Sequence, residues 1–269
     1  IEKGLNTMIL NAEYHTSPNP VTEIPVVVLH GLFGSLSNLG MIARKLNQNH
    51  HVIQMDLRNH GGSPHSSDMS YELMAQDVVE TLDHLQVNLF SLVGHSMGGK
   101  TSMKIVGLFP ERVEQLVILD VAPVPYAGER HEGMFAAIDA VIEQHNPNLS
   151  RTQAAEIMRK YLPHEMIVQF LLKSFVKGQW LYNVDAFKAN YGNLVGWNPI
   201  QPWNKPCLFI RGGNSEYILP QYQAEIEQQF PQAHIETVEG TGHWLHAEKP
   251  DIVLGFIQNY LNHEVEVNV

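Results

Sequence analysis

The chain has 269 residues, of which 44% are hydrophobic, an ordinary composition for a globular protein with a large core. Its formal net charge of −11, from 28 acidic and 17 basic residues, repels phosphate backbones and anionic lipids, so we expect neither nucleic acid nor a membrane as partner. A single cysteine excludes an internal disulfide and favours a reducing, cytoplasmic compartment.

Short apolar runs alternate with longer amphipathic segments, a pattern typical of parallel βαβ units. These runs are rich in Val, Ile and Leu without alternation, which indicates strands buried on both faces of a sheet. The predicted strands cover residues 26–29, 52–55, 89–93, 116–119, 207–210 and 234–238. The sequence therefore predicts an α/β protein with a mostly parallel central sheet of about eight strands flanked by helices.

Helices are predicted where apolar residues recur at helical spacing, over residues 70–85, 97–108 and 252–261. Ser70 is a candidate N-cap of the first helix. Between 124 and 202 strand-like runs give way to helical patterns at 134–142, 151–162 and 166–176. We expect one domain over residues 1–269 that carries a helical lid, residues 124–202, inserted within it.

The segment Gly94-His95-Ser96-Met97-Gly98 follows a predicted strand and precedes a predicted helix, as a nucleophile elbow requires. The turn is so tight that side chains at positions 94 and 98 would clash with neighbouring backbone. The N-terminus of the following helix places partial positive charge beside a developing oxyanion. Ser96 is therefore the candidate nucleophile.

The loop at residues 30–34, His-Gly-Leu-Phe-Gly, directly follows a buried strand and is the candidate oxyanion loop. A tetrahedral intermediate needs two backbone N–H donors. We assign one donor to Met97, the residue after the nucleophile, and the other to Leu32.

His243 lies between the last predicted strand and the last predicted helix, where a loop can bring it to Ser96. It would accept the Ser96 proton and return it to the leaving group. The acid is less obvious. In proteins with this type of nucleophile elbow, the orienting acid usually follows the strand before the histidine, but Ser215 occupies that position here and serine supplies no charge. We favour Asp120, which ends an earlier strand, as the acid; Glu216 is the alternative.

These residues together resemble the α/β-hydrolase superfamily over nearly the whole chain, as does the Asp-Leu-Arg-Asn-His-Gly segment at 56–61. More narrowly, the segments at 31–35, 94–100, 120–123 and 212–215 are similar to a bacterial group of small acyl esterases. That group is described as acting on short acyl esters and acyl-CoA thioesters. The resemblance implies the α/β-hydrolase fold and an acid after the earlier strand, which supports Asp120.

Aromatic side chains, mostly from the predicted lid, are candidates for an apolar acyl pocket. They are Phe33, Phe135, Phe170, Phe175, Trp180 and Trp244. Arg130, Lys173 and Lys177 could meet a coenzyme A phosphate, although a solvated lid face is the favoured interpretation of these three.

The expected function is a carboxylesterase or thioesterase that cleaves short-to-medium acyl esters or thioesters, acyl-CoA among them, through an acyl-enzyme on Ser96. We expect the protein to bind a small-molecule substrate and to be a monomer or a small homo-oligomer. No cofactor or metal is expected, because the fifteen histidines show no zinc-ligand spacing.

Three alternatives remain open at this point. A carbon–carbon lyase or hydrolase of the same fold, such as a menaquinone-pathway lyase, would need basic groups in the pocket for an acidic substrate. A cofactor-free perhydrolase activity often accompanies esterases. A ligand sensor would keep the triad and signal by moving its lid.

Overall fold

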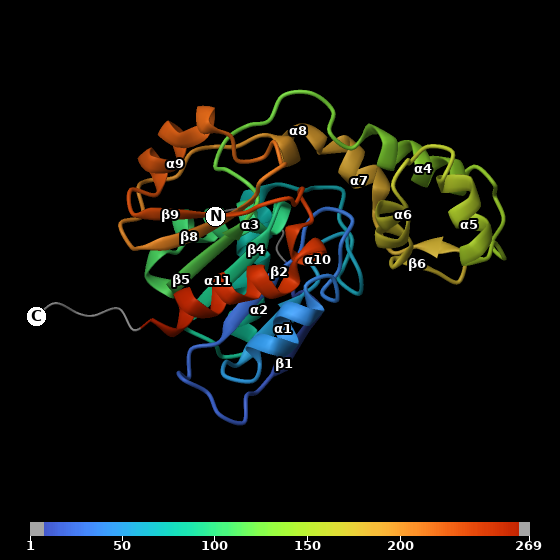
Figure 1. Ribbon diagram of the computed structural model, residues 1–269. Coiled ribbons are helices and arrows are strands. Elements are labelled where there is room, and N and C mark those ends of the chain that lie inside the picture. The colour runs from blue at the N-terminus through green and yellow to red at the C-terminus, as the bar shows by residue number, and fades with distance from the viewer. Residues whose placement is uncertain (1–7, 264–269) are drawn as a thin grey trace, which may run out of the picture.

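A central sheet with helices on both faces, and a helical segment that projects to one side, make up the computed structural model (Figure 1). The structure describes residues 8–263. Its main sheet has the strand order β1-β3-β2-β4-β5-β8-β9, in which β1 is antiparallel to β3 and the other neighbours are parallel. The strands are β1 (Ala12–His15), β2 (Val26–Leu29), β3 (Val52–Met55), β4 (Phe90–His95), β5 (Val113–Leu119), β8 (Cys207–Gly212) and β9 (Ala233–Val238).

Burial on both faces explains why the central strands are continuous apolar runs. In β2, Val27 and Leu29 belong to one hydrophobic cluster, while Val26 and Val28 belong to a second cluster across the sheet. Successive side chains of a strand point to opposite faces, so a strand covered on both faces has no solvated position. The carboxyl ends of the parallel strands meet at one edge, where Ser96, Asp120 and the residues after β8 emerge.

The helices are divided between the two faces of the sheet. Helices α2 (Tyr71–His84) and α3 (Met97–Leu108) contact each other, and α3 lies against β2, β4 and β5. Helices α1 (Gly40–Leu46) and α11 (Pro250–Asn262) contact each other on the other face. Shorter elements lie in the connections: η1 (Pro110–Arg112) between α3 and β5, η2 (Pro220–Tyr222) and α9 (Gln223–Gln229) between β8 and β9, and α10 (Leu245–Glu248) between β9 and α11.

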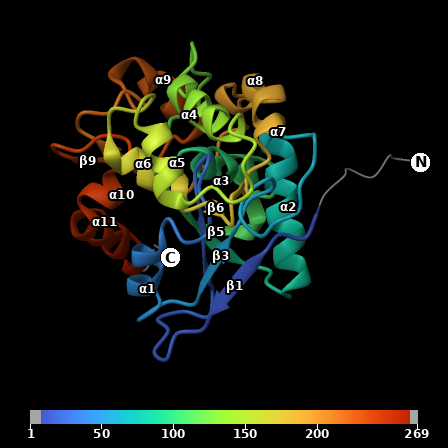
Figure 2. The same cartoon turned by 90° about the vertical axis from the view of Figure 1, so that its right-hand side faces the viewer.

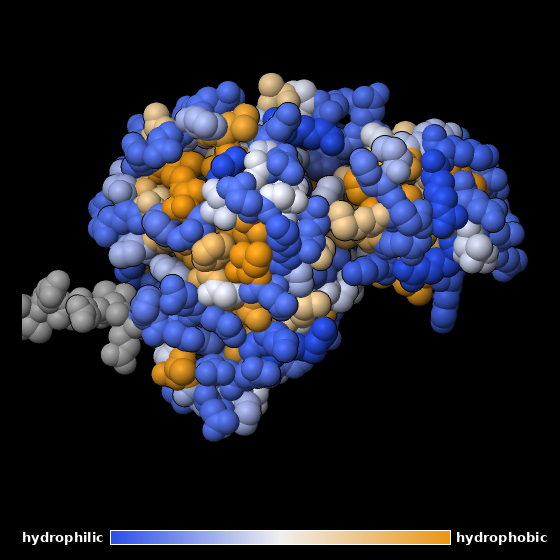
Figure 3. Space-filling view, viewed as in Figure 1, coloured by the Kyte–Doolittle hydropathy of each residue, from blue (hydrophilic) through white to orange (hydrophobic). Residues whose placement is uncertain are grey.

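The chain between β5 and β8, residues 120–206, forms what we call the inserted segment. It contains α4 (Glu132–Ile142), α5 (Arg151–Met158), α6 (Glu165–Leu172), the hairpin β6 (Phe175–Val176) with β7 (Gln179–Trp180), α7 (Val184–Ala189) and α8 (Tyr191–Val195). Helices α4, α5 and α6 pack together and stand away from the sheet in Figure 1; Figure 2 looks at them from the side to which they project. On the face seen in Figure 3 this projection is mainly hydrophilic, with apolar residues where it approaches the body of the protein.

The predicted α/β class with a mostly parallel sheet is confirmed. Residues 8–263 form seven strands in that sheet where about eight were expected. Strand β1 was missed because it is an edge strand of four residues, largely exposed, without an apolar run. The prediction of one helix over 166–176 was wrong at its end: α6 stops at Leu172, and residues 175–176 form β6.

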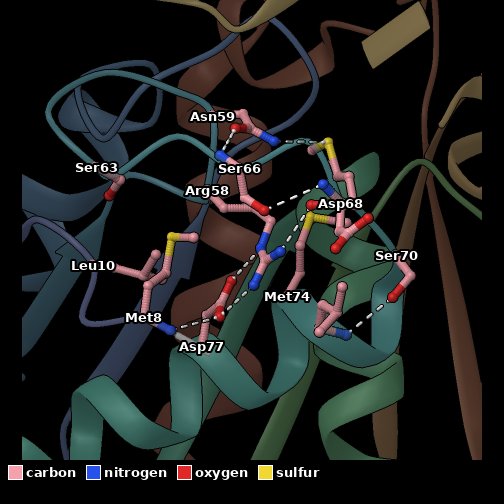
Figure 4. A network of polar contacts seen from close by, with 12 residues as sticks. Met8, Leu10, Arg58, Asn59, Ser63, Ser66, Asp68, Ser70, Met74 and Asp77 are labelled. Carbon is pink, nitrogen blue, oxygen red and sulfur yellow. Dashed lines mark hydrogen bonds and ion pairs between the residues drawn. The ribbon is translucent and has the colours of Figure 1, made fainter. Parts of the chain in front are cut away.

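A buried ion pair fixes the loop after β3 to α2. Arg58 Nε and Nη2 donate to the two carboxylate oxygens of Asp77 at 2.7 and 2.8 Å, and both side chains are fully buried (Figure 4). Arg58 Nη1 donates to the carbonyl oxygen of Asp68 at 2.8 Å. The same loop carries His60, whose Nε2 accepts a hydrogen bond from the Phe33 N–H at 3.1 Å. The ion pair thereby supports the loop that holds Phe33 in place.

Candidate active site

Ser96 sits on a strained turn between β4 and α3, with φ of 54° and ψ of −116°. A left-handed φ is unfavourable for serine and persists only where the surroundings enforce it. A Cβ at position 94 would overlap the carbonyl oxygen of Gly98, and one at 98 would overlap that of Leu29. Both positions therefore require glycine, as predicted, and the turn holds the Ser96 hydroxyl at the carboxyl edge of the sheet.

The structure brings Ser96, His243 and Asp120 together in one hydrogen-bonded line. Ser96 Oγ lies 2.8 Å from His243 Nε2, and His243 Nδ1 lies 2.7 Å from Asp120 Oδ2. The tautomer that satisfies both contacts carries its proton on Nδ1, donates it to the carboxylate and accepts from the serine hydroxyl. The Asp120 side chain is fully buried and that of His243 is 13% exposed. This is the arrangement that activates a serine nucleophile.

Asp120 receives three hydrogen bonds, which hold its carboxylate in place. Besides His243, the Gly212 N–H donates to Oδ1 at 2.9 Å and the Ser215 hydroxyl to Oδ2 at 2.5 Å. Its backbone has a left-handed φ of 53°, a second strained position at this site. Ser215, which the sequence marked as the wrong residue type for an acid, therefore acts on the acid from the adjacent strand end.

Glu216, the alternative acid, is exposed and has no hydrogen bond to His243 in the structure, whose Nδ1 is bonded to Asp120. Its side chain lines the large cavity beside the site instead. Because only one carboxylate contacts the imidazole, the geometry favours Asp120 over Glu216.

The two predicted oxyanion donors, the N–H groups of Leu32 and Met97, flank Ser96. Met97 is the first residue of α3, where backbone N–H groups have no partner within the helix. Leu32 and Ser96 line the same two cavities. The loop is braced from behind, because His30 Nε2 accepts the Leu57 N–H at 2.9 Å and His30 Nδ1 bonds the carbonyl oxygen of Gly31 at 2.8 Å.

Aromatic and histidine side chains surround His243. The Tyr217 ring stacks on its imidazole at 3.9 Å between centroids, and His95 Nε2 bonds its backbone carbonyl oxygen at 2.8 Å. Burial lowers the pKa of His95 well below its ordinary value. Burial likewise lowers the pKa of His131 to about 4 and that of His246 to about 3. These three neighbours are therefore neutral at pH 7 and add no positive charge beside the imidazole.

A cavity of about 400 Å³ opens beside Ser96 and His243. Of the six predicted pocket residues, Phe170 and Trp244 line it. Phe33, in the loop after β2, is instead buried against Phe135, and Phe175 packs on Trp180, so these four residues pack against each other outside this cavity. Hydrophobic side chains at lid-like positions are hard to assign from sequence, because packing and substrate contact select the same residue types.

Arg130 is a basic residue of the site whose place sequence reasoning missed. Its guanidinium lies 4.8 Å from the ring centroid of Tyr126 and 4.9 Å from that of Tyr217. Its Nε is buried without a hydrogen-bond partner, and the residue lines the cavity that contains Ser96. The prediction favoured a solvated surface for Arg130; the structure places it in the cleft, in the loop between β5 and α4.

Comparisons with known proteins identify the family of the chain. The family model described as the alpha/beta hydrolase fold matches residues 24–250. The chain belongs to the α/β-hydrolase family. Within it, the chain is 49% identical over 255 residues to Esterase YbfF of Escherichia coli K12, covering 95% of this chain and all of that one. It is 36% identical to a mouse protein named sn-1-specific diacylglycerol lipase ABHD11, over 94% of this chain and 85% of that one.

A solved structure described as a marine microorganism esterase superimposes with a TM-score of 0.86 at 32% identity, over 94% of this chain and 100% of that one. The predicted resemblance to bacterial serine esterases of this fold, and the prediction of an esterase-type hydrolase, are therefore confirmed. Acyl-CoA specificity stays a prediction.

No helix within residues 8–263 is long and apolar enough to cross a membrane. In the same part of the chain, no three His, Cys, Asp or Glu side chains are grouped so as to hold a metal ion.

Proposed function

We propose that this α/β-hydrolase cleaves short-to-medium acyl esters or thioesters through an acyl-enzyme on Ser96. His243 is the general base and Asp120 orients it. The observation that carries the proposal is the line of contacts from Ser96 Oγ to His243 Nε2 at 2.8 Å and from His243 Nδ1 to Asp120 at 2.7 Å. It lies at the mouth of a cavity large enough for a small-molecule substrate.

The reaction follows from these contacts. Ser96 Oγ attacks the carbonyl carbon while its proton passes to His243 Nε2, and the new oxyanion accepts hydrogen bonds from the Leu32 and Met97 N–H groups. The buried Asp120 carboxylate stabilises the imidazolium. Nε2 then donates its proton to the leaving oxygen or sulfur, and the acyl-enzyme forms. Water, deprotonated by His243, hydrolyses it and regenerates Ser96.

The inserted segment acts as the lid of this site. Its Ile167 and Phe170, on α6, face Trp244 across the cavity, and a second cavity of about 190 Å³ shares these three residues. Lys173 lines that second cavity. The two cavities together provide an extended path for the leaving group, with a cation at its far end. This favours a long alcohol or an anionic thiol such as coenzyme A.

Arg130 supports a second candidate function. A carbon–carbon hydrolase or lyase of this fold needs a basic group inside the pocket for an acidic substrate, and Arg130 lines the cavity with a buried, unpartnered Nε. Ester turnover decides between the two, because a lyase would leave simple esters intact.

The test is hydrolysis of p-nitrophenyl butyrate together with labelling by a fluorophosphonate. We expect the wild type to release p-nitrophenol and to be labelled, and Ser96→Ala to lose both, with kcat/KM lower by at least about 10⁴. Ser67→Ala, which removes an exposed hydroxyl elsewhere, is the matched control. Wild-type protein that neither turns over the ester nor reacts with the probe would refute the proposal.

A further inference from the structure

Two cavities meet at Ser96, and they differ in size and in lining. The large cavity, about 400 Å³, contains His243 and Trp244. The small one, about 30 Å³, lies on the side of α3. Both cavities are lined by Leu32, Ser96, Arg130, His131 and Tyr217. The residues that line only the small one are Met97 and Lys100 of α3, Val121, Leu194 and Val195 at the end of α8, and the rings of Tyr71 and Tyr126. His243 does not line the small cavity.

The position of His243 determines which part of an ester enters which cavity. The leaving atom must lie within hydrogen-bond reach of His243 Nε2, because that nitrogen donates the proton that releases it. The acyl chain is bonded to the same carbonyl carbon and points away from the leaving atom. We propose that the small cavity is the acyl subsite, that the large cavity holds the leaving group, and that Leu194 and Val121 limit the acyl length. This assignment rests on the acyl-enzyme proposed above.

The volume of the small cavity limits the length of the acyl chain that it can hold. A cavity needs roughly 10–15 Å³ to hold one water molecule, which has a single heavy atom. The small cavity, of about 30 Å³, therefore accommodates about two to three heavy atoms. The side chains that end it away from Ser96 are buried: Met97, Val121 and Leu194 are 4%, 2% and 6% exposed. Acyl groups up to butanoyl fit beyond the carbonyl carbon, whereas hexanoyl requires the wall to move. The subsite therefore selects short acyl groups while the large cavity accepts long leaving groups.

The wall formed by α8 is held rigidly to the body of the protein. The Tyr71 hydroxyl donates to the carbonyl oxygen of Leu194 at 2.6 Å. Lys100 Nζ donates to the carbonyl oxygens of Val195 and Gly196 at 3.3 and 3.0 Å. The ammonium also lies 4.7 Å from the ring centroid of Tyr126, which closes the floor of the cavity. Because the backbone is held by these three bonds, shortening the Leu194 side chain enlarges the cavity without displacing the wall.

The experiment measures kcat/KM along two ester series. One varies the acyl group from acetate to butyrate, hexanoate and octanoate with p-nitrophenol constant. The other varies the alcohol from methyl to butyl and octyl with acetate constant. We expect wild-type kcat/KM to fall at least tenfold from butyrate to hexanoate and to change less than about threefold along the alcohol series.

Variants of the wall residues then test whether Leu194 and Val121 limit the acyl length. We expect Leu194→Ala to raise the hexanoate-to-acetate ratio about tenfold, since each buried methylene contributes about fourfold to binding, with the alcohol profile unchanged. Val121→Ala tests the opposite wall independently if Leu194→Ala does not fold. Leu149→Ala is an equal truncation in the inserted segment that lines neither cavity, and should keep both profiles. Phe170→Ala should alter the alcohol profile alone.

The assignment is overturned if wild-type protein hydrolyses octanoate as fast as butyrate, or if the Leu194 and Val121 variants shift the alcohol profile and leave the acyl profile unchanged. Failure of the proposed function gives a different result: no ester of either series is hydrolysed and the fluorophosphonate does not label Ser96.

Discussion

Replacing Asp120 by asparagine is the sharpest test of the proposed triad, because the surrounding hydrogen bonds dictate how the amide must lie. The Gly212 N–H lies 2.9 Å from Oδ1 and can only donate, so the amide oxygen must take that position. The amide NH₂ then occupies the position of Oδ2, 2.7 Å from His243 Nδ1. Nδ1 can accept from this group only by losing its own proton, which moves the proton to Nε2.

An imidazole with its proton on Nε2 cannot accept the proton of Ser96. The same change in serine proteases lowers kcat by about 10⁴, which corresponds to about 5.4 kcal/mol at 1.36 kcal/mol per factor of ten. We therefore expect Asp120→Asn to lower kcat for p-nitrophenyl butyrate by about 10⁴ while KM changes little. Ser215 can rotate its hydroxyl to accept from the new NH₂ group, so the fold should survive.

The assay is steady-state hydrolysis, with thermal unfolding of each variant as the control for folding. Glu216→Gln is the matched variant, because Glu216 lines the cavity without contacting the imidazole, and its kcat should stay within about threefold of wild type. If Asp120→Asn keeps activity within tenfold of wild type, or Glu216→Gln loses more than Asp120→Asn, the assignment of the acid is wrong.

Three further predictions concern the support of the site. Ser215→Ala should lower kcat about tenfold, since the carboxylate loses a donor 2.5 Å away; Ser215→Thr keeps the hydroxyl, and an equal loss there would contradict a positioning role. Asp77→Ala should reduce the free energy of unfolding by about 3–5 kcal/mol in urea denaturation, because it leaves the Arg58 charge buried without its carboxylate; a loss below 1 kcal/mol would contradict this. Burial lowers the pKa of His246 to about 3, so the unfolded chain binds the extra proton below pH ~6.5, and stability should fall as the pH drops from 6.5 towards 4. His246→Leu should flatten this dependence, and an unchanged slope would refute the assignment.

The parts of the fold that local chemistry determines could be predicted from the sequence. The strands at 26–29 and 52–55 and the helix Met97–Leu108 have the bounds expected, because continuous β-branched runs and a glycine-flanked turn leave few alternatives. Ser70 caps α2 as expected, its side chain accepting from the Leu73 N–H. In each of these cases the bound of the element is determined by residues next to it in the sequence, through their steric or hydrogen-bonding requirements.

The parts that depend on residues far apart in sequence could not be predicted. Ser215 meets Asp120 across 95 positions, and only the adjacency of β5 and β8 in the sheet brings them together. Arg130, in the loop before α4, contacts Tyr217, which follows β8, and Tyr217 in turn stacks on His243. None of these contacts leaves a motif, because each residue type is common on a protein surface.

The neighbouring positions of β5 and β8 also explain how an acid can move from one strand end to another without changing the chemistry at His243. Leu119 pairs with Ile210, and the Asp120 N–H bonds the carbonyl oxygen of Ile210 at 2.8 Å, so both strands end at the same point beneath the imidazole. Side chains from both strand ends meet beneath the imidazole: Asp120 Oδ2 contacts Nδ1, and Ser215 Oγ contacts the same Oδ2. In the proposed triad, Asp120 supplies the charge from the end of β5, where its backbone has a left-handed φ, and Ser215 supplies a hydroxyl from the β8 side. In the proposed mechanism, His243 requires a negative charge beside Nδ1, whichever strand carries it.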